Sequence, residues 1–168
     1  FDKNMSFGKK WEMKVSQWLQ ENQKYVLEVY EYLDYKNDKN KAPKLHIASP
    51  EKSLAAPDLQ VAQSGCTHWV EVKAKEQPVF YNKIRAWRTG IDLRLWRDYK
   101  EVERVTGIPV YIYFVHCSTN EILSASLSFL KSKASGKQVH KEMVYWNCDS
   151  MKLIARIDEC ETIIGASI

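Results

Sequence analysis

The sequence lacks the features that mark membrane proteins, disulfide-rich secreted proteins and nucleotide-driven enzymes. No apolar run among its 168 residues approaches the roughly 20 that span a bilayer, and no signal-peptide pattern opens the chain, so we expect no membrane partner. The four cysteines are scattered without paired spacing, which favours a reducing, cytoplasmic setting over a disulfide framework or a zinc site. The absence of a glycine-rich phosphate loop and of a serine elbow argues against a nucleotide cofactor and against acyl-transfer chemistry.

The composition is that of an ordinary globular domain. Hydrophobic residues make up 45% of the chain and charged residues 27%. A chain of 168 residues can form a hydrophobic core without stabilising cross-links, so we expect one domain over residues 1–168. The net charge of +4 is only mildly basic, with a local basic surplus between Lys83 and Arg104. Charge therefore leaves nucleic-acid binding open, and the functional interpretation depends on the candidate site.

Local patterns predict alternating helices and strands. A first helix over residues 8–21, capped by Ser6, carries an apolar stripe, and a second over 91–106 ends at Gly107. Residues 110–115 are typical of a buried central strand. Further strands are predicted at 25–35, 44–48, 58–62, 67–75, 141–146 and 152–157, a helix at 121–133, and connections at 37–43 and 49–56.

Acidic and basic residues are concentrated in the two adjacent predicted strands at 58–62 and 67–75. Asp58 follows a proline at the start of the first, and Glu71 and Lys73 stand two apart in the second. Strand alternation puts Trp69, Glu71 and Lys73 on one face and Val70, Val72 and Ala74 on the other. If the strands pair as a hairpin through residues 63–66, two carboxylates and one ammonium converge, an arrangement able to hold a hard divalent cation.

Each of these residues also has a purely structural interpretation. Asp58 is compatible with a turn after proline, and Glu71 and Lys73 with an ion pair on a solvated sheet face. Gln60 and Lys75 lie near the same rim, where they would contact phosphate. A second candidate surface consists of the basic arc of the 91–106 helix, which is either a DNA contact or a solvated face: Arg97, Lys100 and Arg104.

The Pro57-Asp58 and Glu71-Val72-Lys73 segments resemble the signature of the PD-(D/E)XK nuclease superfamily. The order of helix, three strands, helix and strand over residues 8–116 is similar to the αβββαβ core of that superfamily. The resemblance implies an α/β, restriction-endonuclease-like fold with a mixed central sheet flanked by helices, and with residues 117–168 as C-terminal additions. It also implies that Glu12, on the first helix, joins the metal cluster.

By the same resemblance, the chain would be a metal-dependent deoxyribonuclease. Asp58, Glu71, the backbone carbonyl of Val72 and Glu12 would hold Mg²⁺, with Mn²⁺ as a substitute, while Lys73 would position or activate the attacking water. The alternatives are a non-catalytic nucleic-acid-binding module on the same fold and a structural α/β protein with a coincidental motif. The small size also favours a homodimer, because one site cuts one strand. Endonuclease and exonuclease activity, and sequence and structure selectivity, all stay open.

Overall fold

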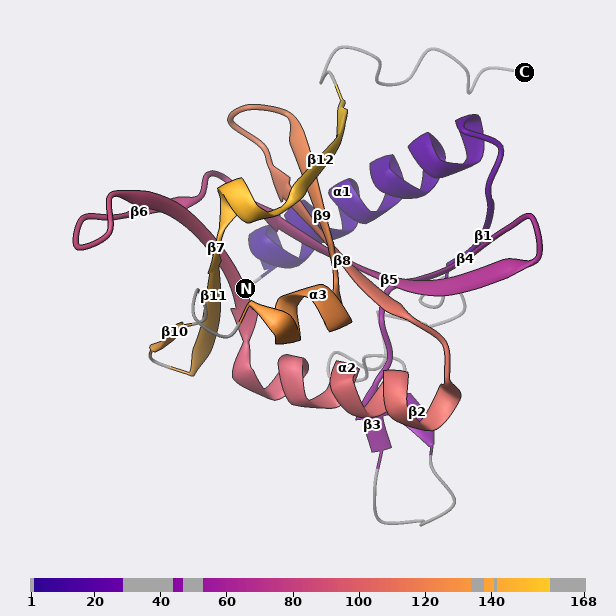
Figure 1. Ribbon diagram of the computed structural model, residues 1–168. Coiled ribbons are helices and arrows are strands. Elements are labelled where there is room, and N and C mark those ends of the chain that lie inside the picture. The colour runs from indigo at the N-terminus through magenta and orange to yellow at the C-terminus, as the bar shows by residue number, and fades with distance from the viewer. Residues whose placement is uncertain (1, 29–43, 47–52, 134–137, 141, 158–168) are drawn as a thin grey trace.

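The computed structural model describes residues 2–28, 44–46, 53–133, 138–140 and 142–157 (Figure 1). The helices are α1 (Asp2–Glu21), α2 (Leu93–Thr106) and α3 (Leu127–Ser132), with a short 3-10 helix at Cys148–Ser150. The strands are β1 (Tyr25–Glu28), β2 (Lys44–His46), β3 (Ser53–Ala55), β4 (Leu59–Gln63), β5 (Cys66–Lys75), β6 (Val79–Tyr81), β7 (Ala86–Asp92), β8 (Val110–His116), β9 (Glu121–Ser126), β10 (Gln138–His140), β11 (Met143–Asn147) and β12 (Lys152–Arg156). Within these residues, no helix is long and apolar enough to span a membrane.

A six-stranded mixed sheet lies at the centre of the molecule, in the order β1-β4-β5-β8-β9-β12. β5 and β8 pair in parallel, and the other neighbouring strands of this sheet pair antiparallel. Parallel neighbours need a long connection, which here contains β6, β7 and α2. Nearly every residue of β8 is buried, as expected for a strand covered on both faces.

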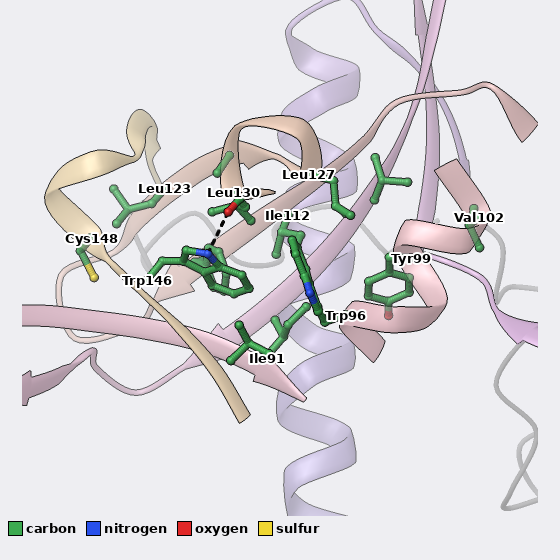
Figure 2. Close-up of a cluster of buried hydrophobic side chains, with 14 of the residues drawn as sticks. Ile91, Trp96, Tyr99, Val102, Ile112, Leu123, Leu127, Leu130, Trp146 and Cys148 are labelled. Atoms are coloured by element: carbon green, nitrogen blue, oxygen red, sulfur yellow. Dashed lines mark hydrogen bonds between the residues drawn. The ribbon is translucent and has the colours of Figure 1, made fainter. Parts of the chain in front are cut away.

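Helices cover both faces of this sheet. On one face, Trp11, Val15 and Leu19 of α1 belong to a buried cluster with Val70 and Val72 of β5. On the other face, a second cluster joins α2, α3 and β11 (Figure 2). Its members include Trp96, Tyr99, Val102, Leu127, Leu130 and Trp146. The Trp146 indole N–H donates to the carbonyl of Leu130 at 3.2 Å, so the polar atom of this buried ring is satisfied.

A second sheet has the strand order β10-β11-β7-β6, and its β6–β7 hairpin projects away from the central sheet (Figure 1). β7 and β11 approach closely at Gly90, where a Cβ atom would collide with the carbonyl oxygen of Val144. A side chain is therefore excluded at this position. Because β7 runs directly into α2, this close pairing also fixes where α2 begins relative to β11.

Both long helices were predicted, but their first residues differ from the prediction. α1 begins at Asp2, so Ser6 lies inside the helix and the predicted cap is wrong. α2 begins at Leu93, because Ile91 belongs to β7 and pairs with Val144. The predicted end of α2 is confirmed: Gly107 has a φ of 67°, and its N–H bonds to the Glu103 carbonyl at 3.1 Å.

The strand predictions succeed where the sequence has an alternating or continuous apolar pattern. They fail where a strand forms only because it pairs with its neighbours. The strands at 58–62, 67–75 and 110–115 are confirmed as β4, β5 and β8, and the late strands as β11 and β12. The helix predicted at 121–133 is wrong over its first half, because residues 121–126 form β9 between β8 and β12. β3 lies in a stretch predicted as a connection, and β6, β7 and β10 were not predicted. The strand at 25–35 is confirmed as far as Glu28, and that at 44–48 as far as His46; their remaining residues and the 37–43 loop lie outside the described residues.

Candidate active site

The site is built on the β4–β5 hairpin, whose register runs from Leu59–Val70 to Gln63–Cys66. Ser64 and Gly65 form its turn with φ angles of 51° and 80°, the left-handed values that a tight hairpin turn requires. Leu59, Val61, Val70 and Val72 all point into the cluster under α1. Strand alternation therefore turns Glu71 and Lys73 to the opposite face, as the sequence predicts.

Asp58 stands just before β4 and is only 5% exposed. Its Oδ2 accepts a hydrogen bond of 2.7 Å from the Val72 N–H, beyond the last residue pair of the hairpin. Burial raises the pKa of Asp58 well above its ordinary value, and the negative charges of Glu71 and Glu12 raise it further. The carboxylate is thus held in place by one backbone bond within a crowded acidic environment.

Glu71 and Lys73 form an ion pair in which Nζ and Oε1 are 2.5 Å apart. Glu71 is 1% exposed, and its second oxygen, Oε2, has no hydrogen-bond partner within the described part of the chain. Burial lowers the pKa of Lys73, but the charges of Glu71 and Asp58 outweigh burial and raise it overall. One lysine therefore faces more carboxylate groups than it can neutralise.

Glu12 approaches the same cluster from α1, although it is distant in sequence. Its carboxylate forms a 3.4 Å ion pair with Lys9. Burial raises its pKa, Lys9 lowers it, and the charge of Glu71 raises it again. Because Glu12 in turn raises the pKa of Asp58, the structure brings all three predicted carboxylates within electrostatic reach of one another.

The Val72 carbonyl points to the same side of β5 as Asp58. In a strand, the N–H and C=O of one residue point to the same side, and the Val72 N–H points to Asp58. Val72 also lies past the Leu59–Val70 pair, where the β4 ladder has ended. Its carbonyl oxygen is consequently on the Asp58 side of β5 rather than in the ladder with β8.

The architecture resembles that of a solved Holliday junction resolvase. Hjc, a Holliday junction resolvase from the archaeal hyperthermophile Archaeoglobus fulgidus, matches with a TM-score of 0.54 at 10% identity, over 85% of this chain and 90% of that one. The chain has the restriction-endonuclease-like fold. A nuclease from a fusselovirus also aligns, with a TM-score of 0.43 at 15% identity over 90% of this chain and 84% of that one. No protein-family model and no curated protein matches the sequence.

The predicted restriction-endonuclease-like fold is thereby confirmed. The αβββαβ core corresponds to α1, β1, β4, β5, α2 and β8, with β5 and β8 as its parallel pair. On this restriction-endonuclease-like core, β9, α3 and β12 extend the central sheet and its covering layer, while the β6–β7 hairpin lies between β5 and α2.

Asp92 is a charged neighbour of the site that the sequence prediction missed. It ends β7 immediately before α2, and its side chain makes no capping hydrogen bond to that helix. Burial lowers the pKa of Lys73 and of Lys75, and the charge of Asp92 acts against it, so Asp92 lies within electrostatic reach of both lysines. An acid just before a helix is a recognisable signal, but the predicted helix began at Ile91 and therefore concealed it.

The remaining predicted residues surround the cluster or lie farther off. Gln60 is half-buried opposite Trp69 in the hairpin. Lys75 shares the face of Lys73, and burial is the main cause that lowers its pKa.

On the outer side of α2, Arg97 is exposed, Lys100 lies over the Trp96 ring, and Arg104 makes a bidentate pair with Glu101. Arg97 and Arg104 face away from the buried side of α2, as predicted, whereas Lys100 borders it, and contact of this arc with DNA stays a prediction.

The donor groups of the site fit a hard divalent cation completed by ligands from outside the chain. Among the described residues, no three His, Cys, Asp or Glu side chains are gathered closely enough to enclose a metal by themselves. However, Glu71 Oε2 is buried and has no hydrogen-bond partner among the described residues, and the pKa of Asp58 is raised by burial and by neighbouring acids. Mg²⁺ typically takes one or two carboxylates and completes its shell with water and phosphate oxygens, which matches this arrangement.

Proposed function

We propose that the protein is a Mg²⁺-dependent nuclease that hydrolyses phosphodiester bonds in DNA. The observation that carries this proposal is the pair of buried carboxylates, Asp58 and Glu71, beside Lys73 on a hairpin of a restriction-endonuclease-like fold. Burying two acids in proximity destabilises a protein unless a cation compensates them. A single lysine compensates one of them, so the site is suited to a second positive charge.

In this proposal, each residue has a distinct part in the reaction. Asp58, Glu71 and the Val72 carbonyl would hold Mg²⁺, with Glu12 acting directly or through a water. The bound ion would lower the pKa of a coordinated water and neutralise charge that develops on the phosphate. Lys73 donates hydrogen bonds to the scissile phosphate and orients the attacking water.

The decisive test is cleavage of a panel of DNA substrates by the wild-type protein. Linear duplex, single-stranded, four-way branched and supercoiled DNA would each be incubated with Mg²⁺, Mn²⁺ or EDTA. We expect cleavage of at least one substrate with either metal and none with EDTA. The matched variant is Glu71→Gln, which keeps the size of the side chain and removes its charge, and which should not cut.

Two results would overturn the proposal. Binding of DNA without cleavage under every condition would identify a non-catalytic nucleic-acid-binding module. Cleavage that persists in EDTA or in Glu71→Gln would place the chemistry elsewhere. A measurement of mass in solution, with and without duplex DNA, tests the associated proposal that two copies act together on the two strands.

A further inference from the structure

A cleft of about 550 Å³ lies between the β6–β7 hairpin and the end of the central sheet. Its lining includes Trp87 of the hairpin, Met151, and the polar residues His116, Ser118 and Asp149. This volume lies in the range of sites that hold small organic molecules. None of these residues has a part in the proposed hydrolysis, so any ligand of the cleft would be bound separately from the reacting phosphate.

The cleft is on the same face of the central sheet as the candidate active site. His116 is the parallel partner of Lys75, and alternation puts Lys75 on the face of Lys73 and Glu71. The chain leaves β5 and reaches the cleft at Gln77, four residues beyond Lys73 and therefore at most about 14 Å away. At the rise of B-form DNA, roughly four nucleotides of one strand cover this distance.

The walls of the cleft suit a flat ring with a polar edge. Trp87 is 46% exposed and meets Phe80 edge-on, with ring centroids 5.0 Å apart, so a large part of the indole is open for stacking. Met151 supplies an apolar surface in the same lining. Ser118 and Asp149 supply polar groups to the same lining. A nucleobase has both a π-face and a hydrogen-bonding edge.

The charge of the hairpin is complementary to a nucleic-acid strand. Between Gln77 and Ile91 the sequence contains basic residues and no acid. Lys83 and Arg85, at the tip of the hairpin, are both exposed. An exposed aromatic residue beside basic side chains is the combination with which proteins bind single strands, because stacking engages the base and the cations attract the backbone.

We propose that this cleft binds the base of an unpaired nucleotide, stacked on Trp87, in a DNA strand whose phosphodiester lies at the candidate active site. The proposal rests on the proposed nuclease function and specifies its substrate class as DNA with an unpaired strand next to the cut. A base within a duplex is already stacked and paired, so it does not enter the cleft without being extruded.

The test measures binding in EDTA, so that cleavage does not interfere. Oligonucleotides would carry the fluorescent base 2-aminopurine, either in a single-stranded tail or inside a perfect duplex. We expect quenching for the tailed substrate only. Trp87→Ala should weaken binding of the tailed substrate by about fivefold or more, as expected for the loss of one base–aromatic stack, and should abolish the quenching. Trp87→Phe should retain most of both.

The matched control is Ile84→Ala, which removes an equally exposed apolar side chain from the same hairpin and should bind like the wild type. Equal weakening by Ile84→Ala, equal loss of duplex binding by Trp87→Ala, or unchanged quenching in Trp87→Ala would overturn the proposal. A dimer that becomes monomeric in Trp87→Ala with unchanged quenching would assign the surface to contact between copies instead.

The outcomes also separate this site from the proposed function. Trp87-dependent quenching without cleavage of any substrate in Mg²⁺ would leave the base site standing and refute the nuclease. Metal-dependent cleavage without Trp87-dependent quenching would support the nuclease and refute the base site.

Discussion

The β4–β5 and β6–β7 hairpins depart from the usual distribution of side chains in opposite directions. In the first, Asp58 and Glu71 are 5% and 1% exposed; in the second, Phe80 and Trp87 are 43% and 46% exposed. Buried carboxylates and exposed aromatic rings both reduce stability relative to the conventional arrangement. The first hairpin thus offers buried carboxylates to the proposed cation, and the second offers exposed rings to the proposed nucleobase.

The largest effect is expected from removing a carboxylate of the first hairpin. Asp58→Ala or Glu71→Ala should reduce cleavage at least about 100-fold, because each variant removes an oxygen donor from the proposed metal site. The fold should survive, since removing one of several crowded acids relieves repulsion. Turnover at saturating Mg²⁺, together with a circular dichroism spectrum, checks both points. Wild-type turnover in either variant would exclude that residue as a ligand.

Substitution of Lys73 tests whether its positive charge accelerates the reaction or only binds DNA. Lys73→Ala should lower turnover by roughly 100-fold while changing DNA affinity much less, because its contact with the phosphate strengthens in the transition state. Lys73→Arg should restore little, since a guanidinium differs in geometry from an ammonium. Separate measurement of kcat and of the DNA dissociation constant distinguishes an effect on turnover from an effect on affinity. Weak binding with full turnover at saturation would identify a simple phosphate anchor.

Stability should distinguish the apolar residues of the two hairpins. Val70→Ala should lower the free energy of unfolding by about 2 kcal/mol, because Val70 is fully buried under α1. Trp87→Ala should lower it by about 1 kcal/mol or less, although it removes a larger side chain. Urea unfolding of both variants is the measurement. A greater loss for Trp87→Ala would show that the second hairpin is structural.

The smallest effect is expected from the basic arc of α2, which belongs to neither hairpin. If Arg97, Lys100 and Arg104 bind DNA phosphates, the triple alanine variant should bind less tightly at low salt. The slope of log affinity against log salt should then fall by about 1 for each phosphate that is no longer neutralised, with sequence preference unchanged. Arg104 is paired with Glu101 and is therefore less available to phosphate, so it should contribute least to the change in slope. An unchanged slope would assign phosphate binding to other lysines, such as Lys83 on the second hairpin.

Residues whose environment follows from a local pattern were predictable. The alternation in 58–62 and 67–75 determines which side chains share a face, so the positions of Asp58, Glu71 and Lys73 follow from the sequence once the hairpin closes. Gly107 as the end of α2 and the burial of β8 were equally local, because a left-handed glycine and a continuous apolar run each carry their own signal.

What the sequence determined by itself is therefore the chemistry of the site and the local order of its strands; tertiary structure decided what comes near them. The approach of Glu12 and Asp92 to the hairpin depends on how α1 packs and where β7 ends, which are interactions between distant segments. The same holds for β9, which pairs on both sides where a helix was predicted, and for the cleft beside Trp87. A short strand gains its hydrogen bonds and its burial from its neighbours, so no pattern within the strand specifies it.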